Sequence, residues 1–513
     1  MAQHEMPGAP PRVQPTDPAD PRDPTPPTRS SRWAISRGQL FMLLAIFLPA
    51  AASMLAPVLT GDVSYQIQTG RLMFEAREIV DTDPFTFTVL GEPWLNQQWG
   101  AGVILAATFD SVGWIGLLVM RALLIGFAFG LVYAACRATA ASQIVSSLVT
   151  LGMFVVAATN LALRSQIFGV VSFAAVVAIL AWRRKHPLLL WLIPLIMIFW
   201  ANTHGSFFVG WAAIGLAALE DLAARSRLAP VTIAVGVLSV LATLVHPWGI
   251  DMWAYVVELS TNPLIASLVT EWQPSTLKTP TGLFFFVSVA LVLVLLLVRG
   301  RAISWLQIAW LAGLALLALM AVRGVAWWAI GAAPVVAILV SGLVVRGRTV
   351  GDPAFDRPRG VGYTVIAGLA AVLALAVLPI WKPIDSLYGP EGVVRYAPRG
   401  VTETLLAQAT ADDRLFAEQK WASWFEMAVP DVPVMVDTRI ELFDREIWGD
   451  YLHVQAGRAD WADILDRWEI TLIAAEAGNV QLRPFLDEHP AWELLHEDGE
   501  GAVYRRAQAE EAT

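Results

Sequence analysis

The stretch GDVSYQIQTGRLMFEAREIVDTDPFTFTVLGEPWLNQQW, residues 61–99, decides how the rest of the chain is interpreted. It is a polar insert between a first long apolar run, residues 40–60, and a series of further apolar runs. A run of about 20 apolar residues can cross a bilayer, so Asp62 should lie at the mouth of a membrane domain. We interpret residues 61–99 as the front wall of an active site. On this stretch alone a second interpretation stays open, in which Asp62 is only a solvated residue at a helix end.

The composition is typical of a membrane protein with many spans. The 513 residues are 56% hydrophobic and 15% charged, with a mean hydropathy of +0.56. This is too apolar for a soluble globular protein. From Lys382 onward there are 12 Lys and Arg against 26 Asp and Glu, whereas the preceding residues have 23 against 18. We therefore expect an acidic tail domain after a mildly basic membrane domain, and no nucleic-acid partner, because neither part has clustered positive charge.

Eleven apolar runs predict eleven membrane-spanning helices within a membrane domain of residues 37–381. The further run 100–112 is short, and the positions of the basic clusters indicate whether it spans the membrane. If it does not span, clusters such as 183–185 all fall on the cytoplasmic side, as the positive-inside rule requires. We therefore predict that 100–112 is an interfacial or half-inserted helix in a first outer loop, residues 61–113. The eleven runs are 40–60, 114–136, 142–161, 166–182, 187–201, 205–223, 229–245, 281–298, 303–322, 325–345 and 361–381.

The two ends of the chain differ from this middle part. Residues 1–36 are rich in Pro, Asp, Arg, Ser and Thr, which predicts a disordered segment, and its arginines place it in the cytoplasm. Residues 382–508 alternate strand-like and helical patterns, which predicts a small α/β domain. Parity after eleven spans places this domain outside, and its size predicts that it folds alone. The last residues, 509–513, are predicted to be disordered.

The predicted topology brings polar residues that are scattered along the sequence to the outer face. Arg164 and Arg323 stand out, because arginines on that face run against the charge bias and a guanidinium binds phosphate through a planar fork of donors. Alternatively, each arginine caps a helix or pairs with a nearby acid. Besides Asp62 as the catalytic residue, the predicted substrate-binding residues are Asp83, Asn96, Gln97, Arg164, Asn202, His204, His246, Glu271 and Arg323.

Several kinds of chemistry have no support in the sequence. No P-loop, GxGxxG, HExxH, GxSxG or CxxC motif is present, so nucleotide cradling and zinc hydrolysis are not indicated. The single cysteine, Cys136, excludes an intrachain disulfide. His204 and His246 could ligate a metal ion together with Asp62 and Glu271, and a structural role at a helix end is the competing interpretation. No cofactor is indicated with certainty, and a divalent metal ion stays open.

A series of short motifs carries a resemblance to a known family. In order they are GDVSYQIQTGRLM and DTDPFTFTVLGEPWLNQQW in the first loop, ANTHGSFFVG at 201–210, HPWG at 246–249, EWQPST at 271–276, RGVAWWAIGAAP at 323–334, and the closing stretches 414–443 and 490–506. Together they resemble the bacterial GT-C glycosyltransferases, in particular the glycosyltransferase 39-like group, which use polyprenyl-phosphate-linked sugars on the outer face of the membrane.

The resemblance implies a fold and a function. The fold is a polytopic helical membrane domain with an outer α/β domain, located in the inner (plasma) membrane. The resemblance makes Asp62 the first-loop acid that serves as base or metal-phosphate ligand, and Arg323 a contact of the lipid phosphate. Many relatives have paired acids in this loop, whereas Val63 and Ser64 follow Asp62 here, which leaves the metal in doubt. The implied partners are the bilayer, a polyprenyl-phosphate-linked sugar and an envelope glycan or glycolipid acceptor. The rival hypothesis is a non-catalytic membrane protein that binds or transports lipid-linked saccharide.

Overall fold

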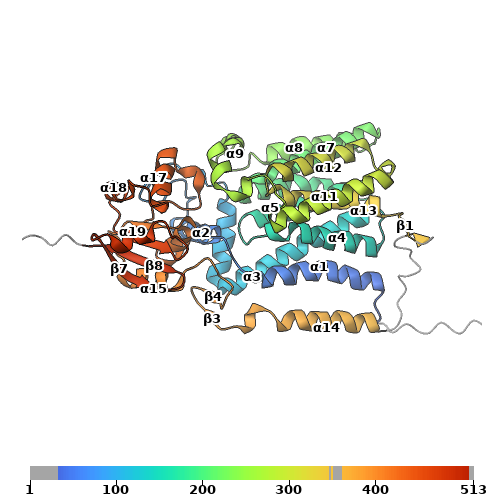
Figure 1. Cartoon of the computed structure of the whole chain (residues 1–513). Coiled ribbons are helices and arrows are strands. Elements are labelled where there is room, and N and C mark those ends of the chain that lie inside the picture. The colour runs from blue at the N-terminus through green and yellow to red at the C-terminus, as the bar shows by residue number, and fades with distance from the viewer. Residues whose placement is uncertain (1–32, 346–347, 350–360, 508–513) are drawn as a thin grey trace, which may run out of the picture.

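The protein consists of a bundle of apolar helices with a small α/β domain at one end, as Figure 1 shows. The computed structural model describes residues 33–345, 348–349 and 361–507. Most of the predicted disordered N-terminus and the whole of the tail 509–513 lie outside these described residues.

The helices of the bundle coincide with the eleven predicted apolar runs. Of the helices in the described ranges, five are long and apolar enough to cross a membrane, and six are shorter apolar helices of 10–17 residues. The number of membrane crossings itself stays a prediction. The bundle helices are α1 (Arg37–Leu55), α3 (Trp99–Ala138), α4 (Gln143–Ala157), α5 (Gln166–Trp182), α6 (Ile193–Thr203), α7 (Phe208–Ala223), α8 (Ala229–Ala242), α11 (Pro280–Arg299), α12 (Trp305–Met320), α13 (Gly324–Val340) and α14 (Gly362–Ala376).

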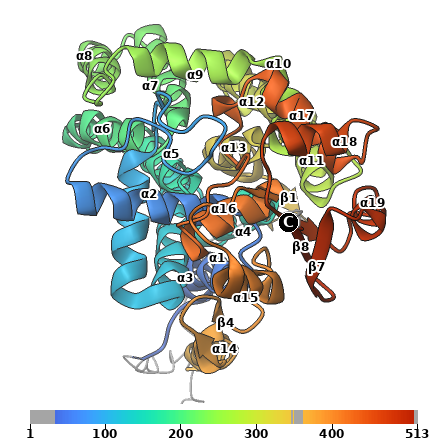
Figure 2. The same cartoon turned by 90° about the vertical axis from the view of Figure 1, so that its left-hand side faces the viewer.

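Two helical segments lie across the end of the bundle that faces the α/β domain. They are α2 (Asp62–Ala76) and the first part of α3, residues 99–112, and Figure 2 shows this end toward the viewer. The chain turns sharply at Gly113, where φ is 65° and ψ is −156°, a backbone conformation that favours glycine. The two segments approach closely at Gly70, where a Cβ would lie 2.3 Å from the carbonyl oxygen of Gly102. This placement agrees with the predicted interfacial helix 100–112, although its depth in a bilayer stays a prediction.

The connections between bundle helices also contain short elements. Helices α9 (Asp251–Thr261) and α10 (Pro263–Leu268) and the 3₁₀ turn η4 (Thr270–Trp272) lie between α8 and α11. The other short elements are η1 (Ala158–Asn160), η2 (Pro187–Leu192), η3 (Gly205–Phe207), η5 (Gly300–Ala302), η7 (Pro379–Trp381), β1 (Val344–Val345), β2 (Arg348–Thr349), β3 (Ile384–Asp385) and β4 (Gly389–Pro390).

The C-terminal domain has the predicted α/β character. Its sheet has the order β5-β6-β8-β7, with β5 and β6 parallel and the other neighbours antiparallel. The strands are β5 (Leu415–Ala417), β6 (Leu472–Glu476), β7 (Trp492–Glu497) and β8 (Gly501–Arg506). The helical elements are α15 (Arg399–Gln408), α16 (Gln419–Ala428), η8 (Ile440–Leu442), α17 (Arg445–Gln455), α18 (Trp461–Arg467) and α19 (Arg483–Glu488).

Residues 432–437, VPVMVD, have a sequence pattern typical of a strand but do not form one. Pro433 has no N–H to donate to a ladder, and Val434 makes only isolated bridges, to Leu415 of β5 and to Thr86 of the first loop. The run therefore joins the first loop to the domain instead of extending the sheet. Strand β7 and helix α15 were not predicted from the sequence.

The α/β domain is packed firmly against the bundle. A bridge joins Val58 to Val394, and the indole Nε1 of Trp114 donates to the carbonyl oxygen of Leu387 at 2.7 Å. One continuous cluster of buried apolar side chains includes residues of both parts. Independent folding of the domain stays a prediction, but these contacts fix its position over the polar end of the bundle.

Candidate active site

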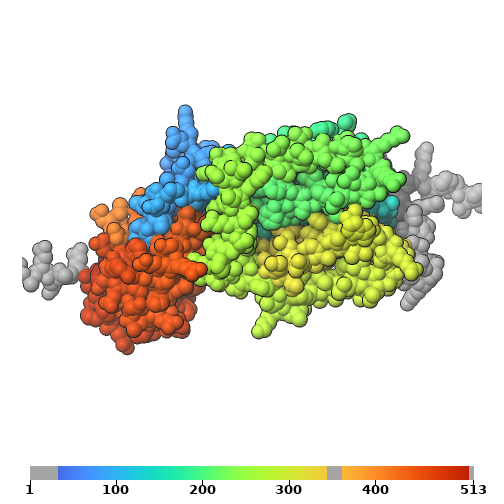
Figure 3. All heavy atoms as spheres, turned by 90° about the horizontal axis from the view of Figure 1, so that it is seen from above, coloured from blue at the N-terminus to red at the C-terminus, as the bar shows by residue number. Residues whose placement is uncertain are grey.

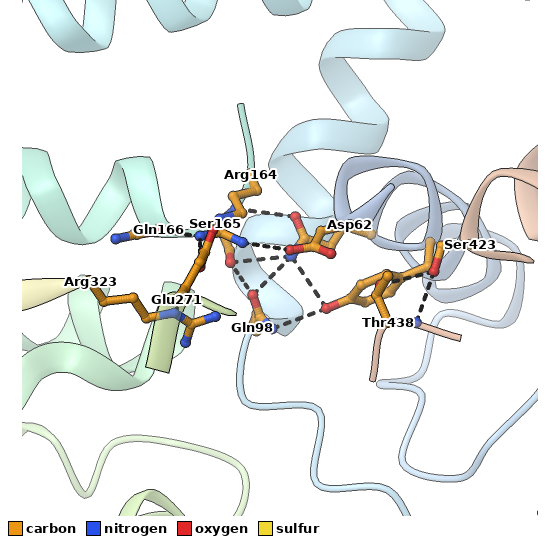
Figure 4. Close-up of polar contacts among 11 residues, drawn as sticks. Asp62, Gln98, Arg164, Ser165, Gln166, Glu271, Arg323, Ser423 and Thr438 are labelled. Atoms are coloured by element: carbon orange, nitrogen blue, oxygen red, sulfur yellow. Dashed lines mark hydrogen bonds and ion pairs between the residues drawn. The ribbon is translucent and has the colours of Figure 1, made fainter. Parts of the chain in front are cut away.

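A polar cavity lies where α2, the connections at the same end of the bundle and the α/β domain meet. Its volume is about 260 Å³. Figure 4 shows the side chains from these three sources pointing toward one another. The lining residues are Asp62, Tyr65, Gln97, Gln98, Arg164, Leu259, Ile265, Leu268, Val269, Thr270, Glu271, Trp272, Arg323, Gln419, Thr438, Arg439, Ile440 and Glu441. The cavity thus brings together five of the residues singled out from the sequence: Asp62, Gln97, Arg164, Glu271 and Arg323.

Arg164 is the buried centre of a network of ion pairs. One terminal nitrogen, Nη1, donates to Oδ2 of Asp62 at 2.9 Å, and Nη2 contacts Oε2 of Glu271 and Oε1 of Gln166. Arg323 donates from Nε to the same Glu271 oxygen at 3.0 Å. Burial acts to raise the pKa of Glu271, but the guanidinium groups of Arg164 and Arg323 outweigh it and lower this pKa to about 2. Glu271 is therefore ionised at neutral pH and holds the two arginines side by side.

Asp62 is the first residue of α2, and its position follows from the local fold. A carboxylate in the first turn of a helix is stabilised by the helix dipole. Gly61 permits the close approach of the α/β domain, because a Cβ there would lie 2.6 Å from the carbonyl oxygen of Lys420. The Asp62 side chain is 23% exposed, and its Oδ1 has no hydrogen-bond partner within the described ranges. One carboxylate oxygen of this cavity-lining residue is thus fixed by Arg164, while the other has no partner among the described residues.

A network of amide and hydroxyl groups lies behind Asp62. Gln66 donates to Oε1 of Gln98 at 2.9 Å and to Oγ of Ser165 at 3.2 Å, and it accepts from the Ser165 backbone N–H at 3.1 Å. Gln98 donates in turn to the Tyr65 hydroxyl at 3.1 Å. These bonds tie α2, the first loop and the start of α5 together. Gln66 and Tyr65 were not singled out from the sequence, although they lie four and three residues after Asp62 on one helix face.

Arg323 differs from Arg164 in keeping donors available. Its guanidinium lies over the Trp272 ring, 5.0 Å from the ring centroid, and Nε is used by Glu271. Its two terminal nitrogens make no hydrogen bond to any residue in the described part of the chain. A guanidinium with free terminal donors beside a cavity can bind an anionic oxygen group. The assignment of Arg323 to a phosphate stays a prediction.

The α/β domain contributes an acid that the sequence analysis did not single out. Glu441 accepts a hydrogen bond from the Tyr255 hydroxyl at 3.0 Å, and it lines the cavity with Thr438 and Arg439. Burial raises the pKa of Glu441. The cavity therefore contains one acid held ionised, Glu271, and one whose proton is retained to higher pH. The run DTRIE at 437–441, where polar residues interrupt an apolar stretch, could have indicated Glu441 as a candidate.

Two predicted substrate-binding residues of the first loop do not line this cavity. Asp83 accepts hydrogen bonds from the backbone N–H and the hydroxyl of Thr86. It also forms an ion pair with Arg439 at 2.5 Å, and its side chain has no exposed surface. It joins the first loop to the α/β domain. Asn96 is buried and donates to the carbonyl oxygen of Val80 at 3.4 Å.

Three further predicted residues also lie outside the cavity. Asn202 and His246 line a separate open groove of about 570 Å³, where Asn202 accepts a hydrogen bond from the Trp99 indole at 2.8 Å. His204 holds Nδ1 2.8 Å from the Ser206 hydroxyl, at the turn between α6 and η3. His204 is thus engaged locally, whereas Nε2 of His246 is buried with no hydrogen-bond partner within the described residues, and the role of either histidine stays a prediction.

The acids present do not fit a divalent metal ion. Within the described residues, no group of three His, Cys, Asp or Glu side chains converges as a metal site requires. Asp62 and Glu271 are both engaged by Arg164, so a cation would have to replace this guanidinium. We therefore assign no step to a metal.

Comparison with solved structures identifies the architecture. The mycobacterial arabinofuranosyltransferase AftD superimposes with a TM-score of 0.54 at 16% identity, covering 94% of this chain and 40% of that one. ArnT from Cupriavidus metallidurans, solved bound to undecaprenyl phosphate, gives 0.51 at 13% identity, covering 92% and 98%. The Archaeoglobus fulgidus oligosaccharyltransferase gives 0.53 at 10% identity, covering 92% and 75%.

This chain has the GT-C fold. The match to ArnT extends over nearly the full length of both chains. The chain spans less than half of the length of AftD. No protein-family model and no curated protein matches the sequence. The predicted GT-C architecture is thus confirmed at the level of the fold.

Proposed function

We propose that this protein is a membrane glycosyltransferase that transfers a sugar from a polyprenyl-phosphate carrier to a cell-envelope acceptor. One observation carries the proposal: a single cavity holds a carboxylate with one free oxygen, on Asp62, and a guanidinium with free terminal donors, on Arg323. These are the two groups that transfer from a lipid phosphate needs. The GT-C fold, shared with a structure bound to undecaprenyl phosphate, supports this choice of donor.

The proposed chemistry uses these groups in fixed roles. Asp62 accepts the proton of the acceptor hydroxyl as the acceptor oxygen bonds to the anomeric carbon. The bond from that carbon to the phosphate oxygen breaks, and Arg323 stabilises the negative charge that develops on the departing polyprenyl phosphate. Arg164 acts as a positioning residue, because its two terminal nitrogens are held by its acidic partners, Asp62 and Glu271. The apolar side chains of Leu259 and Leu268 border the cavity and offer a surface for the first part of the lipid.

The direct test is turnover by the purified full chain in lipid nanodiscs. The protein is incubated with a pool of polyprenyl-phosphate-linked sugars and candidate envelope acceptors, and the release of polyprenyl phosphate is measured by mass spectrometry. We expect release that depends on the acceptor. Binding of the carrier without any release would favour the rival hypothesis of a non-catalytic carrier of lipid-linked saccharide.

The proposal includes an orientation in the inner (plasma) membrane, with the N-terminus in the cytoplasm and the α/β domain outside. The chain has a single cysteine, Cys136, which is buried. It is replaced first, and single cysteines are then introduced at exposed positions. Glu92 and Gln408 are exposed near the cavity end, and Arg227 is exposed at the other end. A membrane-impermeant thiol reagent applied to intact cells should label cysteine at the first two positions only. Labelling at position 227 alone would reverse the orientation.

A further inference from the structure

A second cavity, of about 710 Å³, lies at the opposite end of the bundle from Asp62. It is formed between the ends of α5, α7, α12 and α13 that point away from the α/β domain. In Figure 3, α7 (green) and α12 (yellow) lie side by side on the face toward the viewer. The lining residues of α7 extend from Ala213 to Ala223, a depth of about 15 Å at about 1.5 Å per residue.

The walls of this cavity combine bulky apolar residues, such as Leu216, Leu306 and Trp310, with several small ones. Ala213, Ala217 and Ala224 of the α7 wall face Ala181 of α5 and Gly331 of α13 across the space. Small residues usually let helices in a membrane approach closely. Here the helices stay apart, and the space left is far larger than the water-sized voids of a packed protein interior. An apolar cleft of this size in a bilayer is filled by an acyl chain in preference to water.

The mouth of the cavity has an excess of positive charge. Arg183 is buried and already paired with Glu220 and Asp221, each at 2.9 Å. The next two residues are cationic as well. Arg184 is 60% exposed, and its nearest carboxylate oxygen, on Asp221, is 3.6 Å away. Lys185 lies over the Trp182 ring at 4.9 Å. Arg183, Arg184 and Lys185 thus share two acids, Glu220 and Asp221, which leaves an excess of one positive charge, and Lys185 has no ion-pair partner within the described residues.

The residues on the opposite side of the cavity mouth are of the kinds found at the level of the lipid headgroups. Trp305 is exposed there, and tryptophan is favoured at the boundary between acyl chains and headgroups. Ser304 caps the N-terminus of α12 beside it, where the helix dipole favours an anion. The cavity thus has an apolar interior deep enough to hold part of an acyl chain. Its rim, at the level of the headgroups, is cationic.

We propose that this cavity is a binding site for one anionic phospholipid. Its acyl chain lies between α7 and α12, and its phosphate group contacts Arg184 and Lys185. The site is separate from the Asp62 cavity and does not depend on the proposed transfer reaction. A bound lipid here would complete the packing of four helices, of which α5 begins next to Arg164 and α13 next to Arg323 at the opposite end of the bundle.

The test is a competition between two lipids with identical acyl chains. The purified full chain in mild detergent is mixed with equal amounts of phosphatidylglycerol and phosphatidylcholine, and bound lipid is counted by native mass spectrometry. We expect about one tightly bound phosphatidylglycerol per chain. Arg184→Ser with Lys185→Ser should lower its preference over phosphatidylcholine by roughly tenfold or more, because each basic residue near a membrane surface contributes to the binding of anionic lipid.

Matched variants separate this site from general surface charge. Arg227→Ser with Arg301→Ser removes two exposed cations from the same end of the bundle but outside the cavity, and the preference should persist. Ala217→Leu fills the cleft and should reduce retention of both lipids. The exposed Arg184 and Lys185 can be changed without affecting packing, so they decide the question even if Ala217→Leu fails to fold. Equal retention of both lipids by the unmodified protein, or equal loss of preference in both charge variants, would overturn the proposal.

Discussion

Two buried arginines, Arg164 and Arg439, each hold two carboxylates, yet their surroundings differ. Arg164 binds Asp62 and Glu271, whose side chains keep 23% and 28% of their surface exposed to the cavity. Arg439 binds Asp83 and Asp437, and in this cluster neither the arginine nor either acid has exposed side-chain surface. The Arg439 guanidinium also lies over the Trp94 ring at 4.5 Å, which closes the cluster from one side.

This difference in exposure distinguishes a cluster that stabilises the fold from a cluster that can bind a substrate. A sealed ion pair contributes to folding because each charge depends on its partner for the solvation it lost, whereas an open pair can exchange its partner for a substrate. Glu426 belongs to the sealed cluster, and burial raises its pKa well above the ordinary range. The Arg439 cluster therefore joins the first loop to the α/β domain, and the Arg164 cluster is the one suited to catalysis.

The largest effect on stability is expected at the sealed cluster. Arg439→Gln leaves Asp83 and Asp437 buried without a counter-charge, which should lower the free energy of unfolding by about 3–5 kcal/mol. The thermal unfolding of detergent-purified protein, or its yield in the membrane, measures this loss. A variant that melts at the wild-type temperature would show that the cluster does not join the two parts.

A smaller loss of stability is expected for the matching change in the open cluster. In Arg164→Gln, water in the cavity can solvate Asp62 and Glu271, so the free energy of unfolding should fall by roughly 1–2 kcal/mol. Turnover should nevertheless fall by at least about tenfold, because Asp62 is no longer oriented. The same melting assay and the nanodisc assay measure the two effects. A stability loss equal to that of Arg439→Gln would remove the distinction between the clusters.

The smallest effect is a pH dependence that comes from Glu271. Its pKa is lowered from an ordinary value of 4.5 to about 2, so its stabilising contribution is present above about pH 4.5 and is lost as the pH falls toward 2. The melting temperature of the wild type should exceed that of Glu271→Gln at neutral pH, and the gap should narrow below about pH 4.5. A gap that stays constant down to pH 3 would mean that the ion pairs of Glu271 with Arg164 and Arg323 do not persist in solution.

The convergence of Asp62, Arg164, Glu271 and Arg323 could be predicted from the sequence. The lengths of the apolar runs and the positions of the basic clusters placed these residues at one end of the bundle, and the structure brings them to one cavity. The same reasoning also placed Asp83, Asn96, Asn202, His204 and His246 there. It could not exclude them, because the end of a bundle is wider than a cavity and topology does not specify which side chains are buried against partners.

The contribution of the α/β domain could not be derived in this way. Glu441 and Thr438 reach the cavity only because the domain is fixed by long-range contacts, such as the bridge between Thr86 and Val434. Nothing local in residues 432–437 distinguishes a strand of the sheet from a segment that joins the first loop. The sequence pattern therefore identified the domain but not the face that it presents to the cavity.

The measurement that tests the central claim most directly compares Asp62→Asn with Asp81→Asn. Asp81 is an exposed acid of the same loop and is the matched control, whereas Asp83 is unsuitable because it is buried against Arg439. Both variants are purified in nanodiscs, checked for a wild-type melting temperature and assayed for release of polyprenyl phosphate. We predict that Asp62→Asn loses turnover on the order of a hundredfold while Asp81→Asn retains it. Full turnover by a folded Asp62→Asn variant would contradict the assignment of Asp62 as the catalytic base.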